Sequence, residues 1–196
     1  MNLLGHLYFS QNDQSLMYAN LYGDFFKGND FSGLSPITKK GILLHRTIDH
    51  YIDHHPAVLD LLHKLYTDLP KVSGIAVDLF FDHLLAQQWQ KYHPEPLDHF
   101  LDKFYLTSVN DIQDFSPEFN QFIEAMRKHN WISHYPSKEG LQKMCNGVSS
   151  RISFPNALSK APIIFEKQKE DIERTFELYM QDAKSYISEY LVRTNG

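Results

Sequence analysis

The segment Val77–Leu85 most constrains how this chain can fold, because it is apolar enough to be buried yet contains Asp78, Asp82 and His83. Burying a charge is costly unless the charge is paired or bound to a cation. On a helix, Asp78 and Asp82 would lie one turn apart on the same face. We therefore expect a central buried helix whose acidic groups face a partner group or a metal ion.

A second apolar segment, Gly41–Asp49, has a similar arrangement of polar residues. His45 and Asp49 are one turn apart within it, on a helix that otherwise carries mainly apolar residues. Two apolar helices that each present acid and imidazole groups predict a divalent-metal site between them. The alternative is that these pairs arise by chance, since acid and histidine residues four positions apart are not rare in helices.

Helical spacing of apolar residues recurs along the chain, and we find no alternating pattern typical of strands. The sequence thus predicts an all-α fold, a single-domain irregular helical bundle. The predicted helices are Leu3–Phe9, Leu16–Phe26, Pro36–His55, Ala57–Tyr66, Lys71–Tyr92, Leu97–Val109, Pro117–His129, Lys138–Val148 and Ile163–Val192.

The composition is that of a folded protein, with 42% hydrophobic and 14% aromatic residues among 196. This length suits one domain with a substantial core, so we predict a single domain over residues 1–196. The only cysteine, Cys145, excludes an internal disulfide bond and fits a reducing compartment. We see no basic secretory leader and no apolar run of the ~20 residues that a membrane span needs. The expectation is a cytoplasmic protein that does not enter a membrane.

Several classes of function are disfavoured. The formal net charge of −5 argues against broad nucleic-acid binding, which requires a basic surface. The sequence has no glycine-rich phosphate loop, no Gly-x-Ser-x-Gly nucleophile motif and no two-cysteine zinc pattern.

What remains is a set of carboxylate and imidazole groups, which suit manganese, magnesium or iron better than a structural zinc ion. Such an ion lowers the pKa of bound water and neutralises charge on a phosphoryl group. His6 belongs to this set only provisionally, because a lone histidine among apolar residues is more often a hydrogen-bonded core residue. The candidates are Asp24, His45, Asp49, Asp78, Asp82 and His83, with His6 as an addition.

Two charged residues, Asp24 from this set and Arg46, each have an alternative interpretation. Asp24 lies near the end of a predicted helix, where an acid is unfavourable unless a metal ion or Lys27 compensates it. Arg46 follows His45 and is suited to bind phosphate oxygens, but it could instead pair with Asp49 or Asp53 on its own helix.

Four blocks of sequence, in this order and spacing, resemble the acyl carrier protein phosphodiesterase family. They are Met1–Leu7 (MNLLGHL), Ala19–Gly28 (ANLYGDFFKG), Gly41–Asp49 (GILLHRTID) and Asp78–Leu85 (DLFFDHLL). The similarity continues through Asn146–Arg151 into the last helix, so it covers nearly the whole chain. Each block alone has little specificity, whereas four in order are fairly specific.

The resemblance implies an HD-phosphohydrolase-like helical fold. It implies hydrolysis of the phosphodiester that joins 4′-phosphopantetheine to a serine of holo acyl carrier protein. It also implies manganese as cofactor, with magnesium or iron as alternatives. By matching motifs, the resemblance implies Asp24, His45, Asp49, Asp78, Asp82 and His83 as candidate metal or catalytic residues. We expect the metal ligands to be Asp24, His45, Asp49, Asp78 and Asp82. We expect the catalytic residues to be Asp24, His83, Arg46 and His6, the last two because of their own chemistry. Among these, His83 or His6 would donate a proton to the seryl oxygen, and Arg46 would steady the phosphate oxygens, with help from Arg151.

Carrier proteins are strongly acidic, so this function predicts a locally basic docking surface. The alternative is that the basic residues are scattered over the surface. The candidates are Lys39, Lys40, Arg127, Lys128, Lys138, Lys143 and Arg151.

Two other functions stay open. One is an HD-type hydrolase that acts on a nucleotide or a guanosine polyphosphate, and the other is a non-enzymatic helical binding module. The sequence does not define an oligomeric state.

Overall fold

The structure, a computed structural model, describes residues 1–106 and 114–194. In this part of the chain every regular element is a helix, so the all-α prediction is confirmed. The α-helices are α1 (Leu3–Phe9), α2 (Gln14–Leu21), α3 (Pro36–His54), α4 (Pro56–Leu65), α5 (Ser73–Gln87), α6 (Trp89–Tyr92), α7 (Leu97–Leu106), α8 (Pro117–His129), α9 (Lys138–Ser149), α10 (Ala161–Lys167) and α11 (Lys169–Thr194). The 3₁₀ helices are η1 (Tyr22–Asp24), η3 (Trp131–His134) and η4 (Leu158–Lys160).

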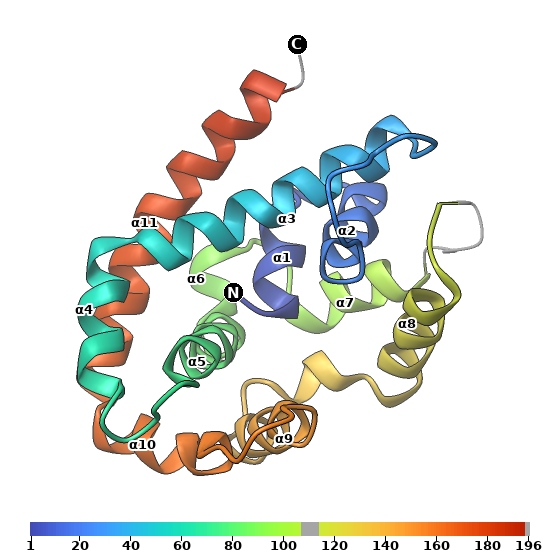
Figure 1. Cartoon of the computed structure of the whole chain (residues 1–196). Helices are drawn as coiled ribbons and strands as arrows, with labels where there is room; N and C mark the ends of the chain where they lie inside the picture. The colour runs from blue at the N-terminus through green and yellow to red at the C-terminus, as the bar shows by residue number, and fades with distance from the viewer. Residues whose placement is uncertain (107–113, 195–196) are drawn as a thin grey trace.

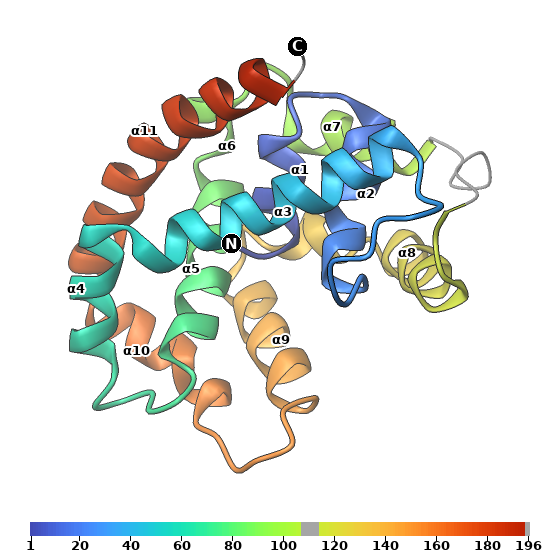
Figure 2. The same cartoon turned by 45° about the horizontal axis from the view of Figure 1, so that its top comes forward.

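Helix α5 forms the centre of the bundle, and α1, α4, α9 and α11 all pack against it. It is buried on several faces, as the apolar run in its sequence predicts, and Phe80, Phe81 and Leu84 are fully enclosed. Helix α3 crosses over α1, and the long helix α11 runs along one side of the bundle (Figures 1 and 2). The contact between α1 and α5 brings the buried side chain of Asp82 on α5 against the start of α1.

Helices α2 and α3 pack closely, and this contact brings the end of α2 next to the middle of α3. Gly41 permits the close approach, because a Cβ added there would lie 2.4 Å from the backbone carbonyl carbon of Ala19. The following 3₁₀ turn, η1, also packs on α3. Asp24 at the end of η1 is thereby held near His45.

The helix predicted over Leu16–Phe26 ends as an α-helix at Leu21 and continues only as the 3₁₀ turn η1 to Asp24. Two other predicted helices are interrupted. The helix predicted over Lys71–Tyr92 breaks at Gln88 (φ −103°, ψ 19°), and the one predicted over Ile163–Val192 breaks at Gln168 (φ −117°, ψ 23°). At Gln168 the chain changes direction, so α10 packs on α9 whereas α11 packs on α3 and α4 (Figure 1). The apolar face continues across this break, so its periodicity does not reveal the bend.

Three other observations complete the fold. The predicted helix over Leu97–Val109 is present to Leu106, and its last three predicted residues lie outside the described residues. Cys145 on α9 is fully buried, and burial raises the pKa of its thiol to about 12. Among the described residues, none of the helices combines the length and the apolar composition that a bilayer crossing requires.

Candidate metal centre

Helix α1 carries His6, and the first turn of this helix is held by side chains on either side. Asn2 caps the helix by accepting a hydrogen bond from the Leu3 amide at 2.7 Å. The Asp82 carboxylate on α5 accepts the amides of Leu4 at 2.7 Å and Gly5 at 3.0 Å. The amides of a helix's first turn lack partners within the helix, so a side-chain oxygen that accepts them stabilises the helix. Asp82 therefore fixes α1, and with it His6, on α5.

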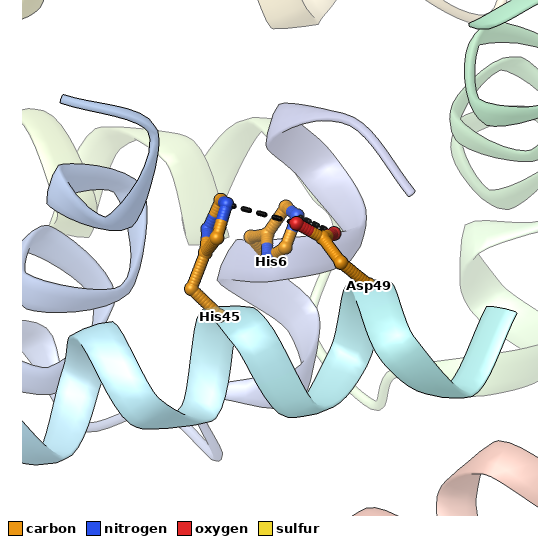
Figure 3. A group of neighbouring side chains, drawn as sticks. All are labelled: His6, His45 and Asp49. Atoms are coloured by element: carbon orange, nitrogen blue, oxygen red, sulfur yellow. Dashed lines mark ion pairs between the residues drawn. The ribbon is translucent and has the colours of Figure 1, made fainter. Parts of the chain in front are cut away.

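His6, His45 and Asp49 form a compact cluster between α1 and α3 (Figure 3). Asp49 Oδ1 lies 3.2 Å from His6 Nε2, and Asp49 Oδ2 lies 3.1 Å from His45 Nε2. The two imidazole rings are stacked, with centroids 4.1 Å apart and planes inclined by 13°. One ligand atom from each of the three residues lies within 4.8 Å of the others. The helical spacing of His45 and Asp49 thus produces the shared face that the sequence predicts.

Asn20 on α2 orients His6, although the sequence analysis assigned it no role. His6 Nδ1 lies 3.0 Å from Asn20 Oδ1, while Asn20 Nδ2 donates to the carbonyl of His6 at 2.9 Å. Because Asn20 Oδ1 can only accept, Nδ1 carries the proton and the Nε2 lone pair faces the cluster. The available signal was a polar residue in the apolar run Leu16–Leu21, which suggests a buried hydrogen bond.

Asp24 completes the cluster at its outer edge. Its Oδ1 lies 3.3 Å from His45 Nε2, and its side chain is 63% exposed. Lys27 does not pair with this carboxylate, since its Nζ donates to the backbone carbonyl of Asp24 at 2.9 Å. The sequence analysis named a metal ion or Lys27 as the group that compensates Asp24. In the structure the carboxylate of Asp24 contacts His45 of the cluster and not Lys27.

The charges of the cluster are strongly coupled. Burial by itself lowers the pKa of His45, but hydrogen bonds to Asp24 and Asp49 outweigh it and raise the pKa to about 9. Burial raises the pKa of Asp49, yet the hydrogen bonds from His45 and His6 hold it well below its usual range. For His6, burial and the neighbouring His45 lower the pKa despite the contact with Asp49. Without a metal ion, one proton on His45 therefore lies between two carboxylates.

The donor set fits a divalent transition-metal ion. Two imidazole nitrogens and one carboxylate are a known ligand combination for such ions, and a buried second partner on a ligating histidine is typical of metal sites. Asn20 is such a partner for His6. His6, His45 and Asp49 would hold the cation, and its charge would replace that of the proton on His45.

The structure places the remaining predicted acids near, but not within, the cluster. Asp78 lines the same pocket as His6, Asp24 and Asp49, and its Oδ1 lies 2.9 Å from the amino group of Met1. Asp82 is fully buried, and its oxygens accept the α1 amides. Asp82 therefore acts on the cluster through the position of α1.

His83 and Arg46 have partners of their own. His83 is buried, with Nδ1 2.6 Å from the carbonyl oxygen of Tyr135. Arg46 donates to the carbonyl of Gly28 at 2.6 Å and to Asn29 Oδ1 at 2.8 Å. Arg46 therefore holds the loop after η1 in place. The structure brings neither His83 nor Arg46 into the cluster.

A second, larger pocket adjoins the cluster, which we call the α9 pocket. Its volume is about 620 Å³, and it is lined in part by α5, α8, η3 and α9. Asn2 and Asp24 line both this pocket and the smaller one, of about 260 Å³, that contains His6 and Asp49. The two pockets therefore meet at Asp24.

Of the basic residues considered for docking, two line the α9 pocket, namely Lys143 and Arg151. Others are engaged elsewhere: Lys138 pairs with Glu166, Arg127 pairs with Glu124, and Lys39 lies over the ring of Phe31. The docking candidates that line the pocket next to the site therefore lie on α9 and just after it.

Together, the fold and the site define a helical protein with a candidate metal centre at the junction of two pockets. Residues 1–183 match the acyl carrier protein phosphodiesterase family, and the chain belongs to that family. It is 28% identical to an acyl carrier protein phosphodiesterase of Salmonella agona (strain SL483) over 152 residues, which is 77% of this chain and 79% of the relative. A protein of the same name from Enterobacter sp. (strain 638) is 29% identical over the same shares of both chains. No solved structure matches the chain, so the implied likeness to HD phosphohydrolases stays a prediction.

Proposed function

We propose that this chain hydrolyses the phosphodiester between 4′-phosphopantetheine and a serine of holo acyl carrier protein. The products would be apo carrier protein and free 4′-phosphopantetheine. The family match and the names of the relatives support this reaction. The observation that carries it is the His6–His45–Asp49 cluster, which offers a ligand set for a metal ion next to Asp24, where the smaller pocket meets the α9 pocket.

In this proposal His6, His45 and Asp49 hold one divalent ion, and manganese is the ion we expect, with magnesium or iron as alternatives. The chemistry that such an ion supplies is the activation of water and the neutralisation of charge on a phosphoryl group. Asn20 keeps the Nε2 lone pair of His6 directed into the site.

Asp24 orients the attacking water. Burial alone would raise the pKa of its carboxyl, but the hydrogen bond from His45 lowers it, so the group is a carboxylate at neutral pH. The water oxygen bonds to phosphorus, the bond from phosphorus to the seryl oxygen breaks, and one proton of the water ends on the seryl oxygen. We assign no step to His83 and Arg46, because their side chains have other partners.

The reaction is tested by mass spectrometry of holo carrier protein after incubation with this protein, with and without manganese. The expected result is loss of the phosphopantetheine mass only when manganese is present. Retention of that mass in both samples would refute the proposal. Turnover of nucleotides or small diesters without turnover of the carrier would favour the nucleotide hydrolase, and no effect of chelation on activity or melting would favour a binding module.

The setting of the reaction follows from the composition. A single buried cysteine fits a reducing compartment, so we place the reaction in the cytoplasm. We treat residues 1–196 as one domain, because the family match spans residues 1–183 without division.

Gly23 allows a test of the metal centre that changes no polar group. A Cβ added at Gly23 would lie 2.3 Å from Cγ of His45, so Gly23→Ala must displace that ring. We expect manganese affinity to fall about tenfold to a hundredfold, as it does when a ligand loses its support. The measurement is a calorimetric titration of the metal-free protein with manganese.

The control is Gly74→Ala, because an added Cβ at Gly74 would have nothing within 4 Å. This variant should bind manganese as the wild type does. If Gly23→Ala also binds with wild-type affinity, His45 is not a ligand in the observed geometry.

A further inference from the structure

The α9 pocket extends from Asp24 over a set of apolar side chains. Phe25, Phe122, Trp131, Met144 and Val148 line it, and each of them is only partly buried against the core. Its volume of about 620 Å³ is within the range of small-molecule sites, which are mostly apolar with a few polar groups. A ligand in this pocket would have one end at Asp24 and the rest of its length along the apolar side chains.

Two cations lie on the side of this pocket that α9 forms. Lys143 and Arg151 are exposed, and neither pairs with a carboxylate in the part of the chain that the structure describes. Lys143 lies one turn before Gly147 on α9, and Arg151 follows the end of this helix. On a protein with a net charge of −5, this local positive charge favours an anionic ligand.

Gly147, between these two cations, leaves space in the pocket. It lies in the last turn of α9 and lines the pocket, and a Cβ added there would meet nothing within 4 Å. Its φ is not in the left-handed region, so the backbone does not require glycine. Since glycine destabilises a helix relative to alanine, neither packing nor backbone geometry accounts for it.

We propose that the α9 pocket binds the 4′-phosphopantetheine arm of the carrier, and that Gly147 keeps this pocket open. The phosphate end lies at Asp24, the arm runs along Phe122, Trp131 and Met144, and Lys143 and Arg151 attract the anionic substrate. This assignment rests on the proposed function. It adds a binding site for the arm and a residue that controls access to it.

The test compares Gly147→Phe, which fills the pocket, with Gly147→Ala, which adds only a methyl group. Trp131 is in the pocket, whereas the other tryptophan, Trp89, is 2% exposed and belongs to the core. Tryptophan fluorescence during titration with free 4′-phosphopantetheine therefore reports occupancy of the pocket, and Trp131→Phe should remove the signal. Calorimetric titration with manganese shows whether the metal centre of each variant is intact.

We expect Gly147→Phe to weaken binding of 4′-phosphopantetheine and to lower kcat/KM for holo carrier protein, each at least about tenfold. Manganese affinity should stay at the wild-type value in both variants, and Gly147→Ala should weaken binding of the arm by a smaller factor than Gly147→Phe. Gly74→Ala, at a position that does not line the α9 pocket, should bind the arm like the wild type. Equal titration curves and equal kcat/KM for wild type and Gly147→Phe would overturn the assignment, as would a wild type that does not bind 4′-phosphopantetheine.

The two proposals fail in different ways. If the wild type binds 4′-phosphopantetheine and Gly147→Phe does not, but holo carrier protein is not cleaved, the proposed function fails and the arm site stands. If the wild type cleaves the carrier and Gly147→Phe cleaves it equally well, the proposed function stands and the arm site fails.

Discussion

Replacing Asp49 by Asn should reduce cleavage of holo carrier protein at least about a hundredfold, because even partners of metal ligands cost tenfold to a hundredfold when removed. Asp49 contacts both histidines, with one oxygen 3.2 Å from His6 and the other 3.1 Å from His45. Asparagine has the same shape but loses the charge and one acceptor, so the cluster loses its central ligand. The measurement is kcat/KM at saturating manganese, together with manganese affinity by calorimetry.

The protein contains a matched control for this substitution. His55 Nε2 lies 3.2 Å from Asp182 Oδ2, a pair of the same kind between the end of α3 and α11. Asp182→Asn should leave kcat/KM and manganese affinity at wild-type values. An Asp49→Asn variant that keeps wild-type kcat/KM would exclude the cluster as the catalytic centre.

Replacing Asp82 by Ala should have the largest effect on stability. The change leaves the buried amides of Leu4 and Gly5 without acceptors, and an unsatisfied buried donor costs roughly 1–3 kcal/mol. We expect the free energy of unfolding, measured by urea denaturation at pH 5, to fall by about 3 kcal/mol. Because α1 carries His6, manganese affinity should fall as well. A loss below about 0.5 kcal/mol, the range of ordinary surface substitutions, would contradict this role.

Asp82 also predicts how stability depends on pH. Burial raises the pKa of its carboxyl to about 7, although the N-terminal amino group and the amides of Leu4 and Gly5 act in the opposite direction. In the unfolded chain an aspartate has a pKa of about 3.9, so the protonated carboxyl stabilises the fold below about pH 4. That contribution is lost as the pH rises toward 7. The stability difference between wild type and Asp82→Ala should therefore decrease over this interval, and a difference that grows with pH would contradict the raised pKa.

The sequence predicted most of the helices, because their signals are local. Leu3–Phe9 has the same bounds in the structure as in the prediction, and the caps at Ser35 and Ser116 accept amides of their own first turns. The breaks at Gln88 and Gln168 were missed. The break at Gln168 redirects a continuous apolar face from α9 toward α3 and α4, and periodicity alone contains no information about such a change of direction.

The sequence predicted the site less completely, for a different reason. Spacing correctly placed His45 and Asp49 on one face of α3, but the same argument could not say what that face contacts. In α5, Asp82 meets the first turn of α1 rather than the cluster, and His83 meets the carbonyl of Tyr135. Asn20 was missed because its role depends on α1 and α2 packing together, which is a contact between separate segments.

The state of Cys145 has a practical consequence. The side chain of Cys145 on α9 is fully buried, burial raises the pKa of its thiol, and the chain has no other cysteine. Thiol-specific probes should therefore leave the native protein unlabelled. A cysteine introduced at an exposed position, such as Lys128 on α8, would then accept a single fluorophore. Spectroscopic observation of carrier docking would therefore need no cysteine-free background.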